Sequence, residues 1–411
     1  MKTKWCGFIL IFIVFNLGAK ELTFHEALDI IIKNDTYIPP SKAYLESEKT
    51  SRFSSALQFL PSVETGYKKN YDLITDGRSN SLYVSGNLNI FKGGADLSAF
   101  ESKLYSVNKM EKGLVRLEIE REQNAIALLI QMISSKRKLK IQNEMVSIKQ
   151  RSLKLAKERY DKGFAPHDDV LKAQVDYQNA NAGYYGAQID YQDVRAKLMS
   201  LLGDLEVSDN WPFSNQLLKI RDFEQDQDNE ESSHPKILEL QNQFYEQQKR
   251  QNHYRGLLLP SVDFNLSWQK NEILKTISYD RVGVLTVSWQ LFDGLFRWSN
   301  YKAQSAERIN TEFALMREKR QIKEELQSSR EKLKLSIETA KNRDETLKVS
   351  RKLFEKNIHR YNQGKISITD LEWEQNRLLT SENLACDGWA YAHLSFQDYC
   401  HNTGKLLCDC L

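Results

Sequence analysis

The chain is poor in residues that interrupt helices, and it contains no long apolar run. Its 411 residues include only 7 prolines and 18 glycines, which leaves room for long uninterrupted helices. No run of 18 or more apolar residues occurs, which argues against a transmembrane helix. Lysine and arginine (58) nearly balance aspartate and glutamate (55), so the sequence lacks the basic excess of a nucleic-acid-binding protein. An aromatic content of 10% argues against a disordered chain.

Motifs of common enzyme active sites are also absent. The sequence contains no H-E-x-x-H, no P-loop and no G-x-S-x-G, and its seven histidines are scattered. Paired acidic residues on helix faces are more often solvated charges than acid–base catalysts. We therefore expect no catalytic residue, no cofactor and no bound metal.

The first 19 residues are predicted to be a secretory signal peptide. Lys2 and Lys4 precede the apolar stretch GFILIFIVFNL, which is followed by Gly18 and Ala19. This order of basic, apolar and small residues is typical of an export signal, and the apolar stretch is too short to span a bilayer. We place cleavage after Ala19, so the mature protein is expected to work outside the cytosol.

Four of the five cysteines lie in the last 26 residues and cannot cross-link the body of the fold. In an exported chain they can form disulfides, but four cysteines allow three connectivities and the sequence does not choose among them. Their spacing, with His401 beside one of them, fits no established zinc pattern. Local disulfides or free thiols are therefore favoured over a metal site for Cys386, Cys400, Cys408 and Cys410.

An internal repeat organises the sequence. The motif LPSV at residues 60–63 returns at 259–262, and the F-x-G motif of Phe91 returns at Phe292. The distance from the F-x-G motif to the next shared glycine is 72 residues in both copies. A length without insertions indicates a packed, rigid segment, whereas exposed loops tolerate changes of length. A later motif recurs 201 residues on: Arg159, Tyr160, Gly163 and Asp169 correspond to Arg360, Tyr361, Gly364 and Asp370.

Each repeat is predicted to open with a β-hairpin, at about 61–91 and about 261–292. In the second copy Val262, Phe264, Leu266 and Trp268 alternate with polar residues. Alternation over about ten residues suits a membrane-spanning strand that is apolar toward lipid and polar toward water. The same pattern also fits a half-buried hairpin of a soluble sheet, and a single hairpin favours that simpler interpretation.

Long helical hairpins are predicted to follow the strands. Residues 95–162 contain one glycine and no proline, and residues 295–363 contain neither, with apolar residues at coiled-coil-like spacing. A helix of about 68 residues is roughly 100 Å long. Gly163 and Gly364 should end these helices, and shorter helices should return over 166–202 and 366–403. Further helices are expected over 23–57, opening with a Thr23–Glu26 capping box, and over 235–257.

These elements predict two structural repeats within one chain. After the signal peptide we expect repeat 1 over 20–203, with its hairpin tip near 163–169. An acidic linker or equatorial segment should follow over 204–233, and repeat 2 over 234–404, with its tip near 364–370. Residues 405–411 form a cysteine-containing tail. Four spanning strands cannot close a barrel, and open strand edges are not tolerated in hydrocarbon. A membrane protein with this hairpin set must therefore oligomerise, a dimer giving eight strands and a trimer twelve.

These features together resemble the TolC-like outer membrane efflux proteins. The resemblance covers about residues 22–404: the opening LTFHEALDIIIKND, the duplicated LPSV–hairpin–F-x-G unit and the R-Y-x-x-G-(x)5-D tips. It implies an α+β membrane protein in the bacterial outer membrane that extends into the periplasm. Each chain of a homotrimer would give four strands to a 12-stranded β-barrel and long helical hairpins to a periplasmic α-barrel. Such exit ducts contact outer-membrane lipid and a periplasmic adaptor (membrane fusion protein), and serve an inner-membrane transporter in tripartite efflux or type I secretion.

The resemblance also assigns a role to the hairpin tips. It implies that a gate at the periplasmic end contains Tyr160, Gly163, Asp169, Tyr361, Gly364 and Asp370. Within this set a hydrogen bond between Tyr361 and Asp169 is expected. Candidate adaptor contacts are Arg159, Gly163, Phe164, Arg360, Gly364 and Lys365. The chain departs from some relatives at Ile366 and Trp373, and simple helix capping and packing explain the tip residues equally well.

Two other interpretations remain open from the sequence. One is a periplasmic coiled-coil adaptor or scaffold that never enters the membrane; it has no need of four strands with lipid-type alternation. The other is an enzyme whose site lies in the cysteine-containing tail. We favour a passive duct whose energy is supplied by a partner, with selectivity set by pore width and lining charge.

Overall fold

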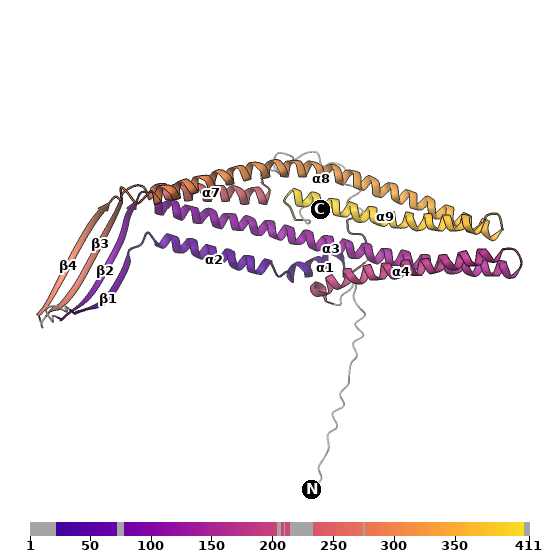
Figure 1. Cartoon of the computed structure of the whole chain (residues 1–411), viewed down its shortest axis with the longest axis horizontal. Helices are drawn as coiled ribbons and strands as arrows, with labels where there is room; N and C mark the ends of the chain where they lie inside the picture. The colour runs from indigo at the N-terminus through magenta and orange to yellow at the C-terminus, as the bar shows by residue number, and fades with distance from the viewer. Residues whose placement is uncertain are drawn as a thin grey trace, which may run out of the picture. The chain divides into compact units, whose positions relative to one another are not determined.

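The computed structural model describes residues 22–71, 78–203, 207–208, 210–213, 233–273 and 276–406. The predicted signal peptide, the acidic run 222–231, Cys408 and Cys410 lie outside these described residues. The elements in chain order are α1(Phe24–Lys33), α2(Ile38–Leu57), β1(Ser62–Tyr71), β2(Arg78–Lys92), α3(Ala95–Asp161), α4(His167–Leu202), α7(Pro235–Gly256), β3(Ser261–Ile273), β4(Thr276–Ser288), α8(Phe296–Asn362) and α9(Ile368–Asn402) (Figure 1).

The long helices are present in both repeats with equal length. α3 and α8 each run for 67 residues, and the returning helices α4 and α9 have 36 and 35 residues. None of the four contains proline. Within the described part of the chain, no helix is both long and apolar enough to cross a bilayer.

The prediction of a single helix over 23–57 is wrong, because the chain forms two helices there. α1 ends at Lys33 and α2 begins at Ile38. Pro39 and Pro40 lie in the first turn of α2, where a missing N–H costs no helical hydrogen bond, and they could not stand inside a longer helix. The predicted capping box of α1 is confirmed: the Glu26 N–H donates to Thr23 Oγ1 at 3.3 Å, and the Thr23 N–H donates to Glu26 Oε2 at 2.8 Å.

The four strands form one antiparallel sheet in the order β1-β2-β3-β4, so the two repeats join at the β2–β3 pair. The register gathers apolar side chains on one face, where Phe264 lies opposite Leu285 and Val262 opposite Val287. Polar residues share the other face, as where Asp263 lies opposite Thr286. Among the described strands, β1 and β4 each have only one neighbour, so both edges of the sheet are open.

The junctions between strand and long helix depend on glycine and on one arginine. Gly93 has φ +60°, and a Cβ there would lie 2.1 Å from the Gly256 carbonyl oxygen, so no other residue fits without a backbone shift. In the second repeat Arg297 holds the turn together. Its Nε donates to Asp293 at 2.8 Å and its Nη1 donates to the Leu257 carbonyl at 2.6 Å.

The chain divides into two compact units that do not coincide with the two repeats. Of the described residues, the hairpin unit takes those within 22–35, 122–213 and 332–397, and the sheet unit takes those within 36–121, 233–331 and 398–406. Both α3 and α8 contribute residues to each unit. The core of the hairpin unit includes a fully buried row on α3, formed by Ile126, Leu129, Ile130 and Ile133.

Part of the predicted linker is packed inside the hairpin unit. The Trp211 ring stacks on the ring of His393 in α9, with centroids 5.3 Å apart, and Phe213 is only 8% exposed. Phe213 also packs at 6.0 Å from Phe396. Aromatic burial therefore anchors the described residues 210–213 to α9.

Candidate functional site at the hairpin ends

The two hairpin ends have the same backbone motif. At the end of α3 the Gly163 N–H donates to the Tyr160 carbonyl and the Phe164 N–H to the Arg159 carbonyl, at 2.9 and 2.8 Å. At the end of α8, Gly364 and Lys365 repeat both bonds at 2.9 Å. Both glycines have positive φ, 73° and 71°, as this helix-ending motif requires. The sequence prediction of glycine stops is confirmed.

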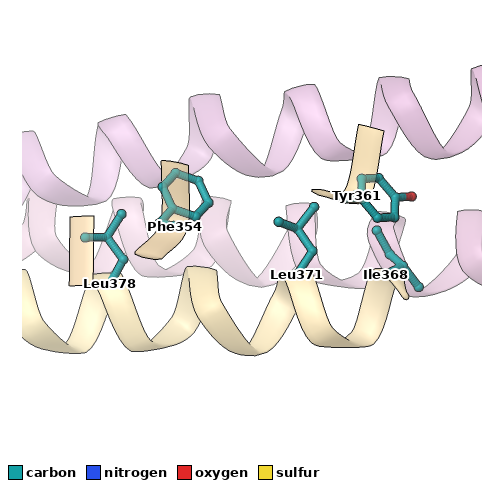
Figure 2. Packing of buried hydrophobic residues seen from close by; sticks show 5 residues of the cluster. All are labelled: Phe354, Tyr361, Ile368, Leu371 and Leu378. Atoms are coloured by element: carbon teal, nitrogen blue, oxygen red, sulfur yellow. The ribbon is translucent and has the colours of Figure 1, made fainter. Parts of the chain in front are cut away.

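A hydrophobic cluster lies behind the second hairpin end. Figure 2 shows its five buried side chains between the helices, with Tyr361 beside Ile368: Phe354, Tyr361, Ile368, Leu371 and Leu378. Phe354 and Tyr361 lie near the C-terminal end of α8, and the other three lie in the first three turns of α9. Tyr361, a predicted gate residue, is thus also a core residue with only 1% of its surface exposed.

Arg159 connects the two hairpins through Tyr361. Its guanidinium carbon lies 4.8 Å from the centre of the Tyr361 ring. Its Nη1 also donates to the Tyr361 carbonyl oxygen at 3.1 Å. A cation over an aromatic face and a charge-assisted hydrogen bond reinforce each other where water is partly excluded. The last turn of α3 is therefore fastened to the last turn of α8.

The expected hydrogen bond between Tyr361 and Asp169 is not formed. The Tyr361 hydroxyl is buried and has no hydrogen-bond partner within the described chain. Burial raises the pKa of Tyr361, and the nearby charge of Asp169 raises it further while Arg159 opposes the shift. The expected bond is absent because Tyr361 is held by Arg159 instead. The Arg159 guanidinium lies over the Tyr361 ring and donates to the Tyr361 carbonyl, while the Tyr361 side chain packs in the hydrophobic cluster.

Asp169 and Asp370, although equivalent in the repeat, differ in role. Asp370 accepts hydrogen bonds from the Ser367 hydroxyl at 2.7 Å and the Ser367 N–H at 3.0 Å, and its own N–H donates to Ser367 Oγ. These bonds from Ser367 hold the pKa of the Asp370 carboxyl below its usual range. Asp370 is thus a capping residue of α9. Asp169 lies in the first turn of α4, whose N-cap is Pro166 and has no side-chain cap.

Further contacts near the ends were not predicted from the sequence. Gln375 of α9 donates to Ser152 of α3 at 2.6 Å, a second link between the hairpins. Lys149 pairs with Asp176 across α3 and α4. Burial raises the pKa of Glu372, and the charge of Asp176 adds to the shift. Gln375 does recur in the repeat, opposite Gln174, which was the only sequence signal for any of these residues.

Other predicted residues are exposed at the ends. Phe164 is 73% exposed and Tyr160 is 44% exposed, with the Tyr160 ring 5.1 Å from that of His167. Trp373, which departs from the pattern of some relatives, is 64% exposed and lies 5.4 Å under the guanidinium of Arg377. The ends thus present aromatic and cationic groups to the solvent.

Three ion pairs link helices of the hairpin unit, joining α8 to α9, α9 to α3 and α3 to α4. Arg351 of α8 pairs with Glu382 of α9 at 2.9 Å, Lys138 of α3 with Asp387 of α9 at 2.7 Å, and Lys149 of α3 with α4. In the view of Figure 1, α8 and α4 lie at opposite sides of this unit.

Helix α4 has an exposed apolar stripe, which we call the α4 stripe. Its residues are between 44% and 62% exposed and follow the 3.5-residue spacing of a coiled-coil seam: Leu171, Val175, Tyr185, Ile189 and Met199. Leu335 and Val349 of α8 are exposed at the other side of the unit.

The described residues form no metal-binding cluster. No group of three histidine, cysteine, aspartate or glutamate side chains is close enough to hold an ion in the part of the chain that the structure describes. Cys386 and Cys400 are buried, and the Cys386 sulfur lies 3.7 Å from the Ser134 hydroxyl. The contacts described at the hairpin ends fasten one helical hairpin to the other.

Comparisons with known proteins agree with this geometry. Residues 34–204 match the model of a family described as outer membrane efflux protein. The fold matches VceC of Vibrio cholerae (TM-score 0.83, 10% identity, covering 93% of this chain and 96% of that one). It also matches the Campylobacter jejuni channel CmeC (0.78, 12%, 93% and 85%) and the open-state MtrE channel of Neisseria gonorrhoeae (0.70, 13%, 93% and 89%). A search of curated proteins returns no match.

Proposed function

We propose that this chain is an outer membrane efflux protein, whose family model residues 34–204 match, and that three copies form the exit duct of a tripartite efflux or type I secretion system. As a member of that family it would be a passive duct of the outer membrane rather than an enzyme. Substrates would enter from an inner-membrane transporter through a periplasmic adaptor and leave to the outside. The energy for transport would come from that transporter.

One observation carries this proposal: the sheet has an exposed apolar face and two open edges. Leu285 and Val287 on that face are 61% and 67% exposed. In water such a face would aggregate, and in lipid the unpaired backbone groups of β1 and β4 would be prohibitively costly. Pairing β1 of one copy with β4 of the next removes both problems. Three copies then give twelve strands.

The helices support the same closure. The α4 stripe faces away from the helices of its own chain, and α8 lies at the other side of the hairpin unit in the view of Figure 1. In a ring of three copies, α4 of one protomer would pack against α8 of the next. The apolar residues of the stripe would then be buried at a seam with coiled-coil spacing.

Ile189→Asp tests this assembly. A carboxylate at the centre of an apolar seam should cost about 3 kcal/mol per interface, so the purified protein in detergent should lose its trimer. Light scattering with size-exclusion chromatography measures the mass. Asn179→Asp is the matched control, because Asn179 is exposed on the same helix outside the stripe and should leave the trimer intact.

Conductance decides whether the trimer is a duct. The wild-type trimer, reconstituted into planar bilayers, should give discrete conductance steps that Ile189→Asp protein does not give. A wild-type chain that is monomeric in aqueous buffer and gives no steps would instead support a periplasmic scaffold. That result would overturn the proposed function.

The hairpin ends are proposed as the gate and the adaptor contact. The fastening of Arg159 to Tyr361 would hold the two hairpins of each protomer together and keep the duct narrow, a role first expected of the Tyr361–Asp169 pair. Phe164, Arg360 and Lys365 would contact the adaptor, since they lie at the turns and Phe164 is largely exposed. Gly163 and Gly364, with their positive φ, would keep both turns in the backbone conformation that the adaptor binds.

A further inference from the structure

The apolar face of the sheet, which we call the outward face, carries charge in only one half. The half next to the helices bears apolar residues and glycine in the paired layers of Val262, Phe264 and Leu266. The half next to the turns bears three cations and one acid among the described side chains: Lys69, Lys270, Arg281 and Glu272. The outward face is thus neutral at one end and net positive at the other.

The cations alternate with aromatic rings across neighbouring strands. Arg281 lies directly opposite Trp268, and Lys270 lies directly opposite Tyr279. The rings of Trp268 and Tyr279 stack with centroids 6.2 Å apart. Lys270 and Arg281 are therefore diagonal neighbours on the two sides of a stacked aromatic pair. On β1, the Lys69 Nζ lies 5.2 Å from the ring of Tyr71.

The depth of these charged residues in the bilayer follows from the energetic cost of placing a charge in lipid. A lysine or arginine on the lipid face of a barrel costs about 2–4 kcal/mol at the midplane and about 0–1 kcal/mol near the interface. The charged half must therefore lie at an interface, where aromatic rings are also favoured. Since the helices leave the opposite end of the strands and extend into the periplasm, this interface is the external one.

We propose that Lys69, Lys270 and Arg281 bind the phosphorylated headgroups of glycolipids in the outer leaflet. Ammonium and guanidinium groups form charge-assisted hydrogen bonds to phosphate, and the neighbouring rings exclude water from these bonds. The proposal rests on the proposed function, because it requires the outward face to meet lipid. It goes further by giving the external half of that face a specific anionic ligand.

Lipid binding by the detergent-purified trimer tests the proposal. The probes are bis-phosphorylated lipid A and the same lipid with both phosphates removed, each titrated in detergent micelles and followed by microscale thermophoresis. The phosphorylated form should bind more tightly, and Lys270→Gln/Arg281→Gln should weaken its binding by roughly tenfold or more. Equal affinity for the two lipids, or wild-type affinity in the double variant, would overturn the proposal.

Two adjacent lysines supply a matched control. Lys69 lies on the outward face, whereas Lys68 pairs with Ser81 on the polar face. Lys69→Gln should reduce binding of the phosphorylated lipid and Lys68→Gln should not, although both remove one charge. An equal loss of binding in the two variants would mean that overall charge alone attracts the lipid, which would contradict a specific site on the outward face.

The test separates this inference from the proposed function. Trimer mass and bilayer conductance are measured for each variant alongside lipid binding. Normal conductance without preference for the phosphorylated lipid would reject the lipid site and leave the duct intact. Loss of conductance in the wild-type protein would instead reject the duct itself.

Discussion

His234 caps the N-terminus of α7 with a ring nitrogen, and this capping depends on the protonation state of the ring. Its Nδ1 accepts from the Lys236 N–H at 3.2 Å, which a protonated nitrogen cannot do. Burial, with the neighbouring charge of His401 second, lowers the pKa of His234 to about 4 from 6.5. The folded pKa lies below the unfolded one, so the associated stability is fully present above pH 6.5 and is lost as the pH falls toward 4.

This shift predicts that acidification from pH 7 to pH 5 costs about 2 kcal/mol of unfolding free energy through His234. His234→Asn should flatten the dependence, because asparagine can cap the helix and does not titrate in this range. Urea unfolding followed by circular dichroism at the two pH values measures the difference. His359→Asn, at an exposed position, should keep the wild-type slope, and an unchanged slope in His234→Asn would disprove the assignment.

The contact between Arg159 and Tyr361 was not predicted from the sequence, although both residues were identified as tip residues. The repeat singled out both residues, and the family resemblance directed attention to Tyr361 and Asp169 as partners. The structure pairs Tyr361 with Arg159, which is 202 positions away in the chain. Spacing along one helix fixes which face a residue occupies, but it does not fix which side chain of another hairpin reaches it.

At the scale of elements, the two strand-to-helix junctions differ at one equivalent position. Gly94 in the first repeat and Leu295 in the second both have positive φ, 78° and 67°. A side chain in this region costs roughly 1–2 kcal/mol, which glycine avoids. Leu295 is 60% exposed and so recovers little of this cost through burial.

Leu295→Gly should therefore stabilise the protein by about 0.5–1 kcal/mol, after the greater unfolded-state entropy of glycine is subtracted. The reverse change at the equivalent position, Gly94→Leu, should destabilise it by a similar amount, although a Cβ there meets no atom within 4 Å. Thermal unfolding of the trimer in detergent measures both. A lower melting temperature for Leu295→Gly would show that its side chain is held by contacts beyond this chain.

Element boundaries followed from the sequence where a single residue dictates the backbone. Gly163 and Gly364 end their helices as predicted, because a left-handed residue must follow the last turn. The division between α1 and α2 was missed, although Pro39 and Pro40 are visible in the sequence. The capping box at Thr23 indicated where a helix begins, but the prolines end its continuation because they remove two adjacent backbone donors.

At the scale of the whole molecule, counting strands was enough to predict an oligomer. Four strands with two open edges cannot be stable in lipid, and this argument needs no atomic detail. The seam residues of the α4 stripe could not be identified in the same way. Their apolar spacing resembles that of the buried faces of α4, and only the structure shows that Ile189 and Tyr185 are exposed in the single chain.

The width of the assembled duct provides the last prediction, because three copies of one contact would set it. If Arg159 fastens the hairpins of each protomer through Tyr361, Arg159→Gln should loosen all three and raise single-channel conductance several-fold in planar bilayers. Arg360→Gln is the matched control, since Arg360 is equivalent in the repeat but exposed and bonded only weakly to Asn357, at 3.5 Å. It should leave conductance unchanged. Equal conductance of the two variants and the wild type, with trimers intact, would mean that the Arg159 contact stabilises the hairpins without gating the duct.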